Sequence, residues 1–140
     1  SFRPFAPTVL EEKADLYFDL KGHQSPYMLL VAPVNTGDIP AVTHVDNSAR
    51  IQTINNAQNQ RFYKLIKEFD RRTGCAVVIN TSFNVRGEPI VCTPEDAINC
   101  FIHTDLDYLV IGNLVLAKGE NLALNKERNM GAYLNKFELD

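Results

Sequence analysis

Apolar residues repeat at helical spacing in one long segment of the chain. Between residues 60 and 73 they recur three or four positions apart, which predicts a helix that buries one stripe against a core. The residues of this stripe are Phe62, Leu65, Ile66 and Phe69. Gly74 follows at once, and glycine readily adopts the left-handed conformation that ends many helices.

Two further helices are predicted from shorter signals. Residues 10–20 carry apolar positions at helical spacing, with acidic residues early in the segment. Thr93 is followed by proline and two acidic residues, which is typical of a helix whose first residue is Pro94 and whose N-cap is a threonine hydroxyl.

Four apolar stretches predict strands. The compact runs 27–34 and 75–80 are expected to be buried strands. The stretch 41–54 predicts two short strands around an Asp-Asn turn, and the stretch 107–117 predicts a hairpin closed by a Gly-Asn turn. The residues expected to form a core with the long helix are Val77, Val78 and Ile79.

Helices and strands therefore alternate irregularly, with at least two hairpins. That order predicts an α/β or α+β fold with a mixed, largely antiparallel sheet and flanking helices, rather than a doubly wound parallel sheet. A length of 140 residues suffices for one hydrophobic core, so we expect a single domain over residues 1–140. Its opening, SFRPFAPTVL, has no initiator methionine and is strongly apolar, which indicates a domain excised from a longer protein.

Composition narrows the classes of partner. The formal net charge of −3 and the pI near 5.6 argue against nucleic acid bound through bulk charge. No apolar stretch reaches membrane-spanning length, so no membrane partner is expected. The 3 cysteines and 3 histidines lack the spacing of metal ligands, so we expect reduced thiols in a cytoplasmic protein and no metal bound by this chain.

A polar stretch, NTSFNVRGEP at residues 80–89, directly follows an apolar run. Ser82 and Asn84 are two positions apart and point the same way in extended backbone, where they could hydrogen-bond a phosphate or carbonyl oxygen. Arg86 adds a bidentate donor, and Gly87 permits close approach of the backbone. The same composition fits a solvated surface loop, and the residues alone leave both interpretations open.

A second polar cluster lies on the strand predicted after residue 47. Alternation places Arg50 and Gln52 on one face and apolar neighbours on the other, and His44 precedes them. An arginine on a strand can be a salt-bridge partner at the rim of a sheet or a ligand for an anion. Because both polar clusters adjoin core strands, we predict that Arg50, Ser82 and Asn84 line one cavity. Neither a phosphate loop of the G-x-x-x-x-G-K-[ST] type nor a G-x-S-x-G motif is present.

Five phrases in order resemble one family. They are FRPFAPTVL, SPYMLLVAPV, PAVTHVDNSARIQTI, GCAVVINTSFNVRGEPIV and TPEDAINCFIHTDLDYLVIGNLVLAK. Together they resemble the C-terminal domain of O-carbamoyltransferases, the family of nodulation protein U and of antibiotic carbamoyltransferases such as the tobramycin enzyme. The resemblance extends from Phe2 to about Lys118.

The resemblance implies a YrdC-like fold, a twisted sheet with a positively charged cavity. It also implies an activity: the domain uses carbamoyl phosphate and ATP, with Mg²⁺, to form carbamoyl adenylate and release pyrophosphate. An N-terminal partner domain of the same chain, which carries a metal, then passes the carbamoyl group to a hydroxyl of a small-molecule substrate.

The resemblance further implies site residues. YrdC-like domains carry a K-x-R…S-x-N signature, and Ser82 and Asn84 supply its S-x-N part. Arg50 matches the arginine of the family's AR-x-Q phrase, which helps to hold carbamoyl phosphate. The implied catalytic residues are Arg50, Ser82 and Asn84, and Arg86 and His44 join them in binding the phosphate-bearing substrates.

The K-x-R that precedes FRPFAP in the family is missing from this chain, so we expect the isolated chain to be inactive or nearly so. A different class of function remains open, a non-catalytic module for nucleotide or phosphate binding or for docking between domains. Other YrdC-like proteins serve tRNA modification, but the acidic balance of this chain counts against an RNA-linked role.

Overall fold

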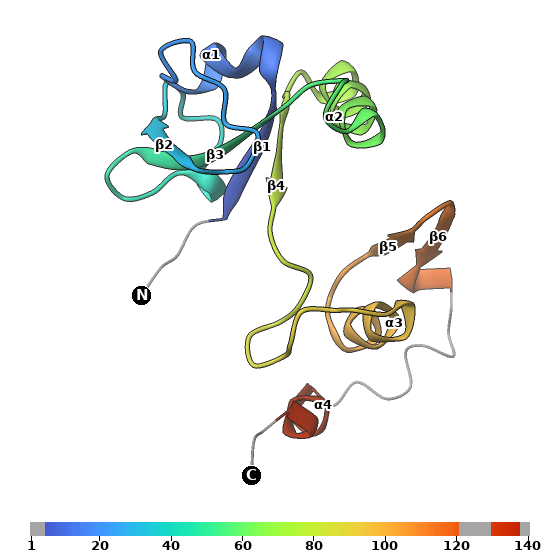
Figure 1. The fold of residues 1–140 in the computed structure, drawn as a ribbon. Helices are drawn as coiled ribbons and strands as arrows, with labels where there is room; N and C mark the ends of the chain where they lie inside the picture. The colour runs from blue at the N-terminus through green and yellow to red at the C-terminus, as the bar shows by residue number, and fades with distance from the viewer. Residues whose placement is uncertain (1–4, 121–129, 138–140) are drawn as a thin grey trace. The chain divides into compact units, whose positions relative to one another are not determined.

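The computed structural model describes residues 5–120 and 130–137, which fall into two compact units. Unit 1 is Ser1–Thr81 and unit 2 is Ser82–Asp140 (Figure 1). Each unit has its own strands, helices and buried core. The sequence-based expectation of one domain over residues 1–140 stays a prediction.

Unit 1 is built on a four-stranded sheet with the order β2-β3-β1-β4. The central strand β1 (Ala6–Leu10) pairs parallel with β3 (Ser48–Ile54) and antiparallel with β4 (Val77–Asn80). Strand β2 (Leu30–Pro33) pairs antiparallel with β3. With one parallel and two antiparallel pairings, the sheet confirms the predicted α/β class with a mixed, largely antiparallel sheet.

Helix α2 (Gln60–Thr73) has the bounds that the sequence predicts. Its N-cap is Asn59, whose side chain accepts a hydrogen bond of 3.1 Å from the backbone N–H of Phe62. It ends at Gly74, where φ is +75°, as expected for a left-handed C-cap. The predicted N-terminal helix is much shorter: a 3₁₀ turn, Glu11–Lys13, leads into α1 (Ala14–Tyr17).

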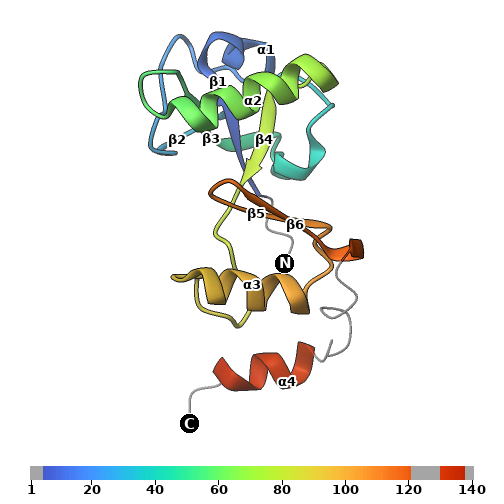
Figure 2. The ribbon, with the colours of Figure 1, turned by 90° about the vertical axis from the view of Figure 1, so that its right-hand side faces the viewer.

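The sheet of unit 1 separates two buried clusters. Helix α2 lies across one face (Figure 2), where Ile66 packs with Leu10, Ile54 and Ala76. The larger cluster lies on the other face, where Val9 and Ile51 meet residues of α1 and the loops around it. The other buried members of this larger cluster are Ala14, Phe18, Leu20, Ala32, Val34, Ile39, Val42, Ala49 and Val77.

The predicted buried stripe of α2 is only partly correct. Ile66 is fully buried and Phe62 is half-buried, but Leu65 is 62% exposed and Phe69 is 41% exposed. The helix meets the sheet along one narrow line of contacts, because β1 and β4 are short strands of 5 and 4 residues. Side chains on either side of that line therefore remain in contact with solvent.

The difference in burial between Ile66 and Leu65 leads to a prediction about stability. We expect Ile66→Ala to lower the free energy of unfolding by about 2–5 kcal/mol, because it leaves a cavity between α2 and the sheet. The matched control, Leu65→Ala on the exposed side of the same helix, should change it by about 0.5 kcal/mol or less. Urea unfolding followed by circular dichroism measures both. Equal losses for the two variants would contradict the observed packing of α2.

Three other expectations for unit 1 need correction. The run 27–34 contains an edge strand, β2, whose Val31 is 60% exposed, because it pairs with β3 on one side only. Strand β4 forms the opposite edge and leaves Ile79 exposed. In the stretch 41–54 only the second strand forms, as β3; a 3₁₀ turn, Pro40–Val42, replaces the first. The central strand β1 was not predicted.

Unit 2 combines a helix with a hairpin, as the sequence predicts. Helix α3 (Pro94–His103) begins with a capping box formed by Thr93 and Asp96. Strands β5 (Tyr108–Ile111) and β6 (Leu114–Ala117) pair antiparallel through the two-residue turn. The core of this unit lies between α3 and the hairpin, with Ala97, Phe101 and Leu109 buried. A short helix, α4 (Met130–Leu134), and the 3₁₀ turn Asn135–Phe137 follow.

Candidate functional site

A network of polar side chains crosses three strands of unit 1. The side-chain oxygen of Gln52 on β3 accepts hydrogen bonds from Thr8 on β1, at 2.9 Å, and from Asn80 at the end of β4, at 2.6 Å. The Gln52 amide nitrogen donates to the carbonyl of Pro26 at 3.0 Å. Gln52 is therefore fixed by three partners, and one region of the sheet face is polar.

Arg50 lies on the same face of β3 as Gln52. The burial pattern of β3 confirms the predicted alternation, with Ala49, Ile51 and Thr53 buried and Arg50 exposed. Within residues 5–120 and 130–137, no hydrogen bond or ion pair engages the Arg50 guanidinium. An exposed guanidinium on a rigid strand, beside a fixed amide, can bind an anion through its bidentate fork.

The S-x-N residues lie in a tight turn of unit 2, residues 82–89, which we call the 82–89 turn. The Ser82 hydroxyl donates to Oδ1 of Asn84 at 2.6 Å, so the two side chains do lie together. The Asn84 amide nitrogen donates to the carbonyls of Glu88, at 2.8 Å, and Val85, at 3.3 Å. Asn84 is thereby held from both ends, and it holds Ser82 in turn.

The other predicted residue of this turn is Arg86. It is exposed, and no ion pair to it is present within the part of the chain that the structure describes. The neighbouring Gly87 has φ of +92°, a conformation that a residue with a side chain adopts only under strain. Gly87 therefore closes the turn. The turn, and not a salt bridge, holds Arg86 at the surface.

His44 lies in the loop that precedes β3. It is half-buried, and its backbone N–H donates to the carbonyl of Ser48 at 2.7 Å. The hydroxyl and backbone N–H of Ser48 both bond the Asp46 carboxylate, and they hold its pKa below the usual range, with the charge of His44 a smaller cause. The loop is thus ordered by its own polar groups.

The predicted residues are distributed between the two units. Arg50 and His44 belong to unit 1, whereas Ser82, Asn84 and Arg86 belong to unit 2. Within its own unit, each group combines an exposed arginine with neutral polar side chains that hydrogen bonds hold in place. That Arg50 lines one cavity with Ser82 and Asn84 stays a prediction.

Sequence reasoning did not identify four residues that shape these sites. Thr8 and Asn80 complete the network around Gln52, and Glu88 organises the 82–89 turn by accepting the backbone N–H of Val85 at 2.9 Å. Tyr133 bonds the other oxygen of the Glu88 carboxylate. Only Gln52 could have pointed to the network, because it shares a strand face with Arg50.

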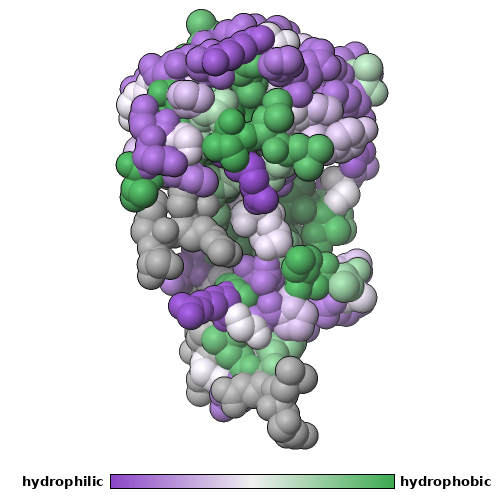
Figure 3. All heavy atoms as spheres, turned by 60° about the vertical axis from the view of Figure 1, so that its left-hand side comes forward, coloured by the Kyte–Doolittle hydropathy of each residue, from purple (hydrophilic) through white to green (hydrophobic). Residues whose placement is uncertain are grey.

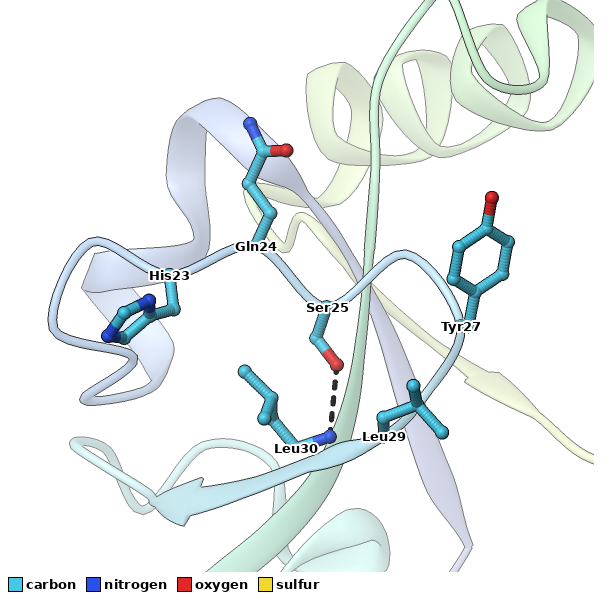
Figure 4. Close-up of a pocket in the computed structure, with 6 residues that line it drawn as sticks. All are labelled: His23, Gln24, Ser25, Tyr27, Leu29 and Leu30. Atoms are coloured by element: carbon cyan, nitrogen blue, oxygen red, sulfur yellow. Dashed lines mark hydrogen bonds between the residues drawn. The ribbon is translucent and has the colours of Figure 1, made fainter.

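A separate pocket of about 370 Å³ lies in unit 1 where the chain enters β2 (Figure 4). Its walls are largely apolar, from Tyr27, Leu29 and Leu30. The Ser25 hydroxyl points to the backbone nitrogen of Leu30 and accepts its hydrogen bond at 3.2 Å, as the dashed line shows. Neither lysine nor arginine lines this pocket, and its polar residues are His23, Gln24 and Ser25.

The described residues, 5–120 and 130–137, contain neither a cluster of metal ligands nor a membrane-spanning helix. Histidine, cysteine and carboxylate side chains there do not gather in groups of three or more that could hold a metal ion. None of the helices there has the length and apolar character needed to cross a membrane. Of the groups in the two candidate clusters, the exposed guanidinium groups of Arg50 and Arg86 are the ones suited to phosphate oxygens.

A family model and several related proteins match this chain. A family model described as the carbamoyltransferase C-terminus matches residues 1–118. An uncharacterized protein of Synechocystis is 47% identical over 163 aligned residues, which cover 100% of this chain and 26% of that protein.

Two relatives have informative names. Nodulation protein NolNO of Sinorhizobium fredii is 44% identical over 122 residues, covering 84% of this chain and 18% of that protein. The 3'-hydroxymethylcephem-O-carbamoyltransferase of Amycolatopsis lactamdurans is 31% identical over 120 residues, covering 85% of this chain and 23% of that protein. The chain therefore spans about a quarter or less of the length of these relatives.

Proposed function

Because the chain belongs to the carbamoyltransferase C-terminus family, we propose that it forms carbamoyl adenylate from carbamoyl phosphate and ATP within a longer carbamoyltransferase. We call that longer protein the parent enzyme. Its N-terminal domain then transfers the carbamoyl group from the adenylate to a hydroxyl of a small molecule. The acceptor is recognised by the N-terminal domain.

One observation carries this proposal: the chain holds two exposed arginines near fixed neutral donors. Arg50 stands beside the Gln52 network, and Arg86 lies in the turn that fixes Ser82 and Asn84. Two anionic substrates must meet in this reaction, so cationic forks are needed to offset their repulsion. Hydroxyl and amide groups that are fixed by their own hydrogen bonds keep the backbone beside each arginine rigid, so the arginines can meet phosphate oxygens at little reorganisation cost.

The proposed reaction consumes one carbamoyl phosphate and one ATP for each carbamoyl adenylate. The carbamoyl phosphate loses its phosphate to water, and a carbamate oxygen then bonds to the α-phosphorus of ATP. The bond from that phosphorus to the β-phosphate oxygen breaks, and pyrophosphate leaves with the bonding electrons. In the last step the acceptor hydroxyl takes the carbamoyl group, loses its proton and releases AMP.

Magnesium enters this scheme as the usual partner of ATP. It neutralises the charge on phosphate oxygens and is held mainly by those oxygens and by water. The donor set described above fits phosphate groups, so the residues of this chain are assigned to the substrates and not to the metal.

The proposal is tested by a pyrophosphate assay with ATP, magnesium and carbamoyl phosphate. The parent enzyme should release pyrophosphate only when all three are present. Pyrophosphate release by the parent enzyme that does not depend on carbamoyl phosphate would contradict the assignment.

A second candidate, docking between domains, is favoured by exposed apolar side chains. Apolar residues appear as green spheres among polar ones on the surface in Figure 3. In unit 2 the outward face of the β5–β6 hairpin is apolar, with Tyr108, Val110 and Val115 all exposed. In unit 1 Leu65 and Phe69 of α2 are exposed. Such surfaces are typical of protein interfaces and are compatible with a catalytic role for the same chain.

A further inference from the structure

Helix α4 contacts the 82–89 turn although it lies beyond the family match, which ends at residue 118. Tyr133 of α4 is only 4% exposed, and its hydroxyl donates a hydrogen bond to Oε1 of Glu88. Next to it, Cδ2 of Leu134 lies 3.8 Å from the position that a Cβ on Gly87 would occupy. Two consecutive residues of α4 thus meet two consecutive residues of the turn.

The ring of Tyr133 is held between two aromatic neighbours. It stacks on His103 of α3, with centroids 4.2 Å apart and planes 9° apart. Phe137 meets it edge-on, with centroids 5.2 Å apart. These contacts fix the direction of the phenol, so its hydroxyl is presented to Glu88 without further loss of side-chain freedom.

Glu88 joins Tyr133 to the residues of the candidate site. Its carboxylate is buried and accepts the backbone N–H of Val85 at 2.9 Å through Oε2. Its carbonyl accepts the Asn84 amide at 2.8 Å, and Asn84 accepts the Ser82 hydroxyl. A continuous path of hydrogen bonds therefore runs from Tyr133 through Glu88 and Asn84 to Ser82.

The buried carboxylate depends on its donors. A buried charge is costly unless hydrogen bonds replace the water that it loses. Burial, and then the neighbouring Glu88, raise the pKa of the Tyr133 hydroxyl and raise the pKa of the Cys100 thiol to about 12. Both groups remain protonated at neutral pH and can donate to Glu88.

The contact between α4 and the turn is not filled by side chains throughout. A cavity of about 330 Å³ lies beside it, lined by residues that include Pro89, Cys92, Tyr133, Lys136 and Phe137. The hydrogen bond from Tyr133 to Glu88 thus links α4 directly to the turn.

We propose that Tyr133 is a positioning residue for the 82–89 turn: through Glu88 it holds Asn84 and Ser82, and so fixes the turn whose exposed Arg86 binds a phosphate group. The phosphate ligand rests on the proposed function, whereas the effect on the turn does not. The C-terminal segment is thus part of the site's support.

The test is Tyr133→Phe in the 140-residue chain, which removes the hydroxyl and keeps the aromatic stack. Losing a hydrogen bond to a charged group should speed amide exchange at Val85 about ten-fold or more, and weaken pyrophosphate binding by a similar factor. Hydrogen exchange by NMR and titration with pyrophosphate measure the two effects. The matched control is Tyr108→Phe, whose hydroxyl is on the exposed face of β5 in the same unit. It should change neither quantity.

A double-variant cycle distinguishes positioning from general support. Glu88→Gln should reproduce both effects, and combining it with Tyr133→Phe should add little, because the two residues act along one path. Unchanged exchange at Val85 in Tyr133→Phe would overturn the proposal. So would faster exchange with unchanged pyrophosphate affinity. If Tyr133→Phe also speeds amide exchange in β5 and β6, the variant has loosened the whole unit. Glu88→Gln then decides, by amide exchange at Val85 and by pyrophosphate affinity.

The inference and the proposed function can fail separately. Weaker pyrophosphate binding in Tyr133→Phe supports the positioning role even if the parent enzyme forms no adenylate, in which case only the proposed function is lost. Carbamoyl-phosphate-dependent pyrophosphate release by the parent enzyme, with no effect of Tyr133→Phe on Val85 or on affinity, leaves the proposed function intact and overturns the inference.

Discussion

Arg50→Ala in the parent enzyme should lower kcat/KM for carbamoyl phosphate about ten- to a hundred-fold. That factor corresponds to the loss of about 1.5–3 kcal/mol, which is typical of a charge-assisted hydrogen bond. Folding should be unaffected, because the side chain lies on the exposed side of β3 while Ala49 and Ile51 form the buried side. Steady-state pyrophosphate release and thermal melting measure the two properties.

The matched control for Arg50 is Arg61→Ala. Arg61 is also exposed, but it lies on α2 and takes no part in the Gln52 network. Arg61→Ala removes the same charge from the same unit as Arg50→Ala, so a general effect of net charge would appear in both variants. Equal activity in Arg50→Ala and Arg61→Ala, with normal melting temperatures, would contradict the role of Arg50.

Asn84→Ala should reduce the same activity about a hundred-fold or more. The substitution removes the acceptor that holds Ser82 and both donors that tie the turn to Glu88 and Val85. Each such bond contributes about 0.5–1.5 kcal/mol, and the bonds act together. Asn99→Ala is the control, because Asn99 is an exposed residue of α3. Comparable activity of the two variants would show that Asn84 has no special role.

Local signals account for the parts of the fold that the sequence predicts well. Helix α2 has a strong cap at Asn59 and a glycine stop at Gly74, so its ends depend on neighbouring residues. Helix α3 begins at a capping box, and the β5–β6 hairpin closes at a two-residue turn. In each case the information lies within a few positions of the chain.

Pairing between distant segments explains what could not be predicted. Whether Val31 or Ile79 is buried depends on β2 and β4 being the two edges of the sheet, which no local pattern reveals. The fully buried strand β1 contains a proline and a threonine, so it does not read as a core strand. Leu65 and Phe69 were expected in the core because helical spacing shows the apolar side of a helix but not how much of it is covered.

The residues of the candidate site also fall into two groups, those that local sequence predicts and those that come from distant segments. Ser82, Asn84 and Arg50 were predicted because they stand in phrases that resemble a family and because alternation fixes the face of β3. The supporting residues were missed because they come from elsewhere in the chain. Thr8 and Asn80 reach Gln52 from other strands, and Tyr133 reaches Glu88 across 45 positions.

The central claim, that the carbamoyl group passes through an adenylate, is tested most directly by product stoichiometry. The parent enzyme is incubated with ATP, magnesium, carbamoyl phosphate and an acceptor, and all phosphorus-containing products are counted by ³¹P NMR. We expect one AMP, one pyrophosphate and one inorganic phosphate for each carbamoyl group transferred. Transfer that yields ADP, or that releases inorganic phosphate with ATP unconsumed, would contradict adenylate formation by this domain.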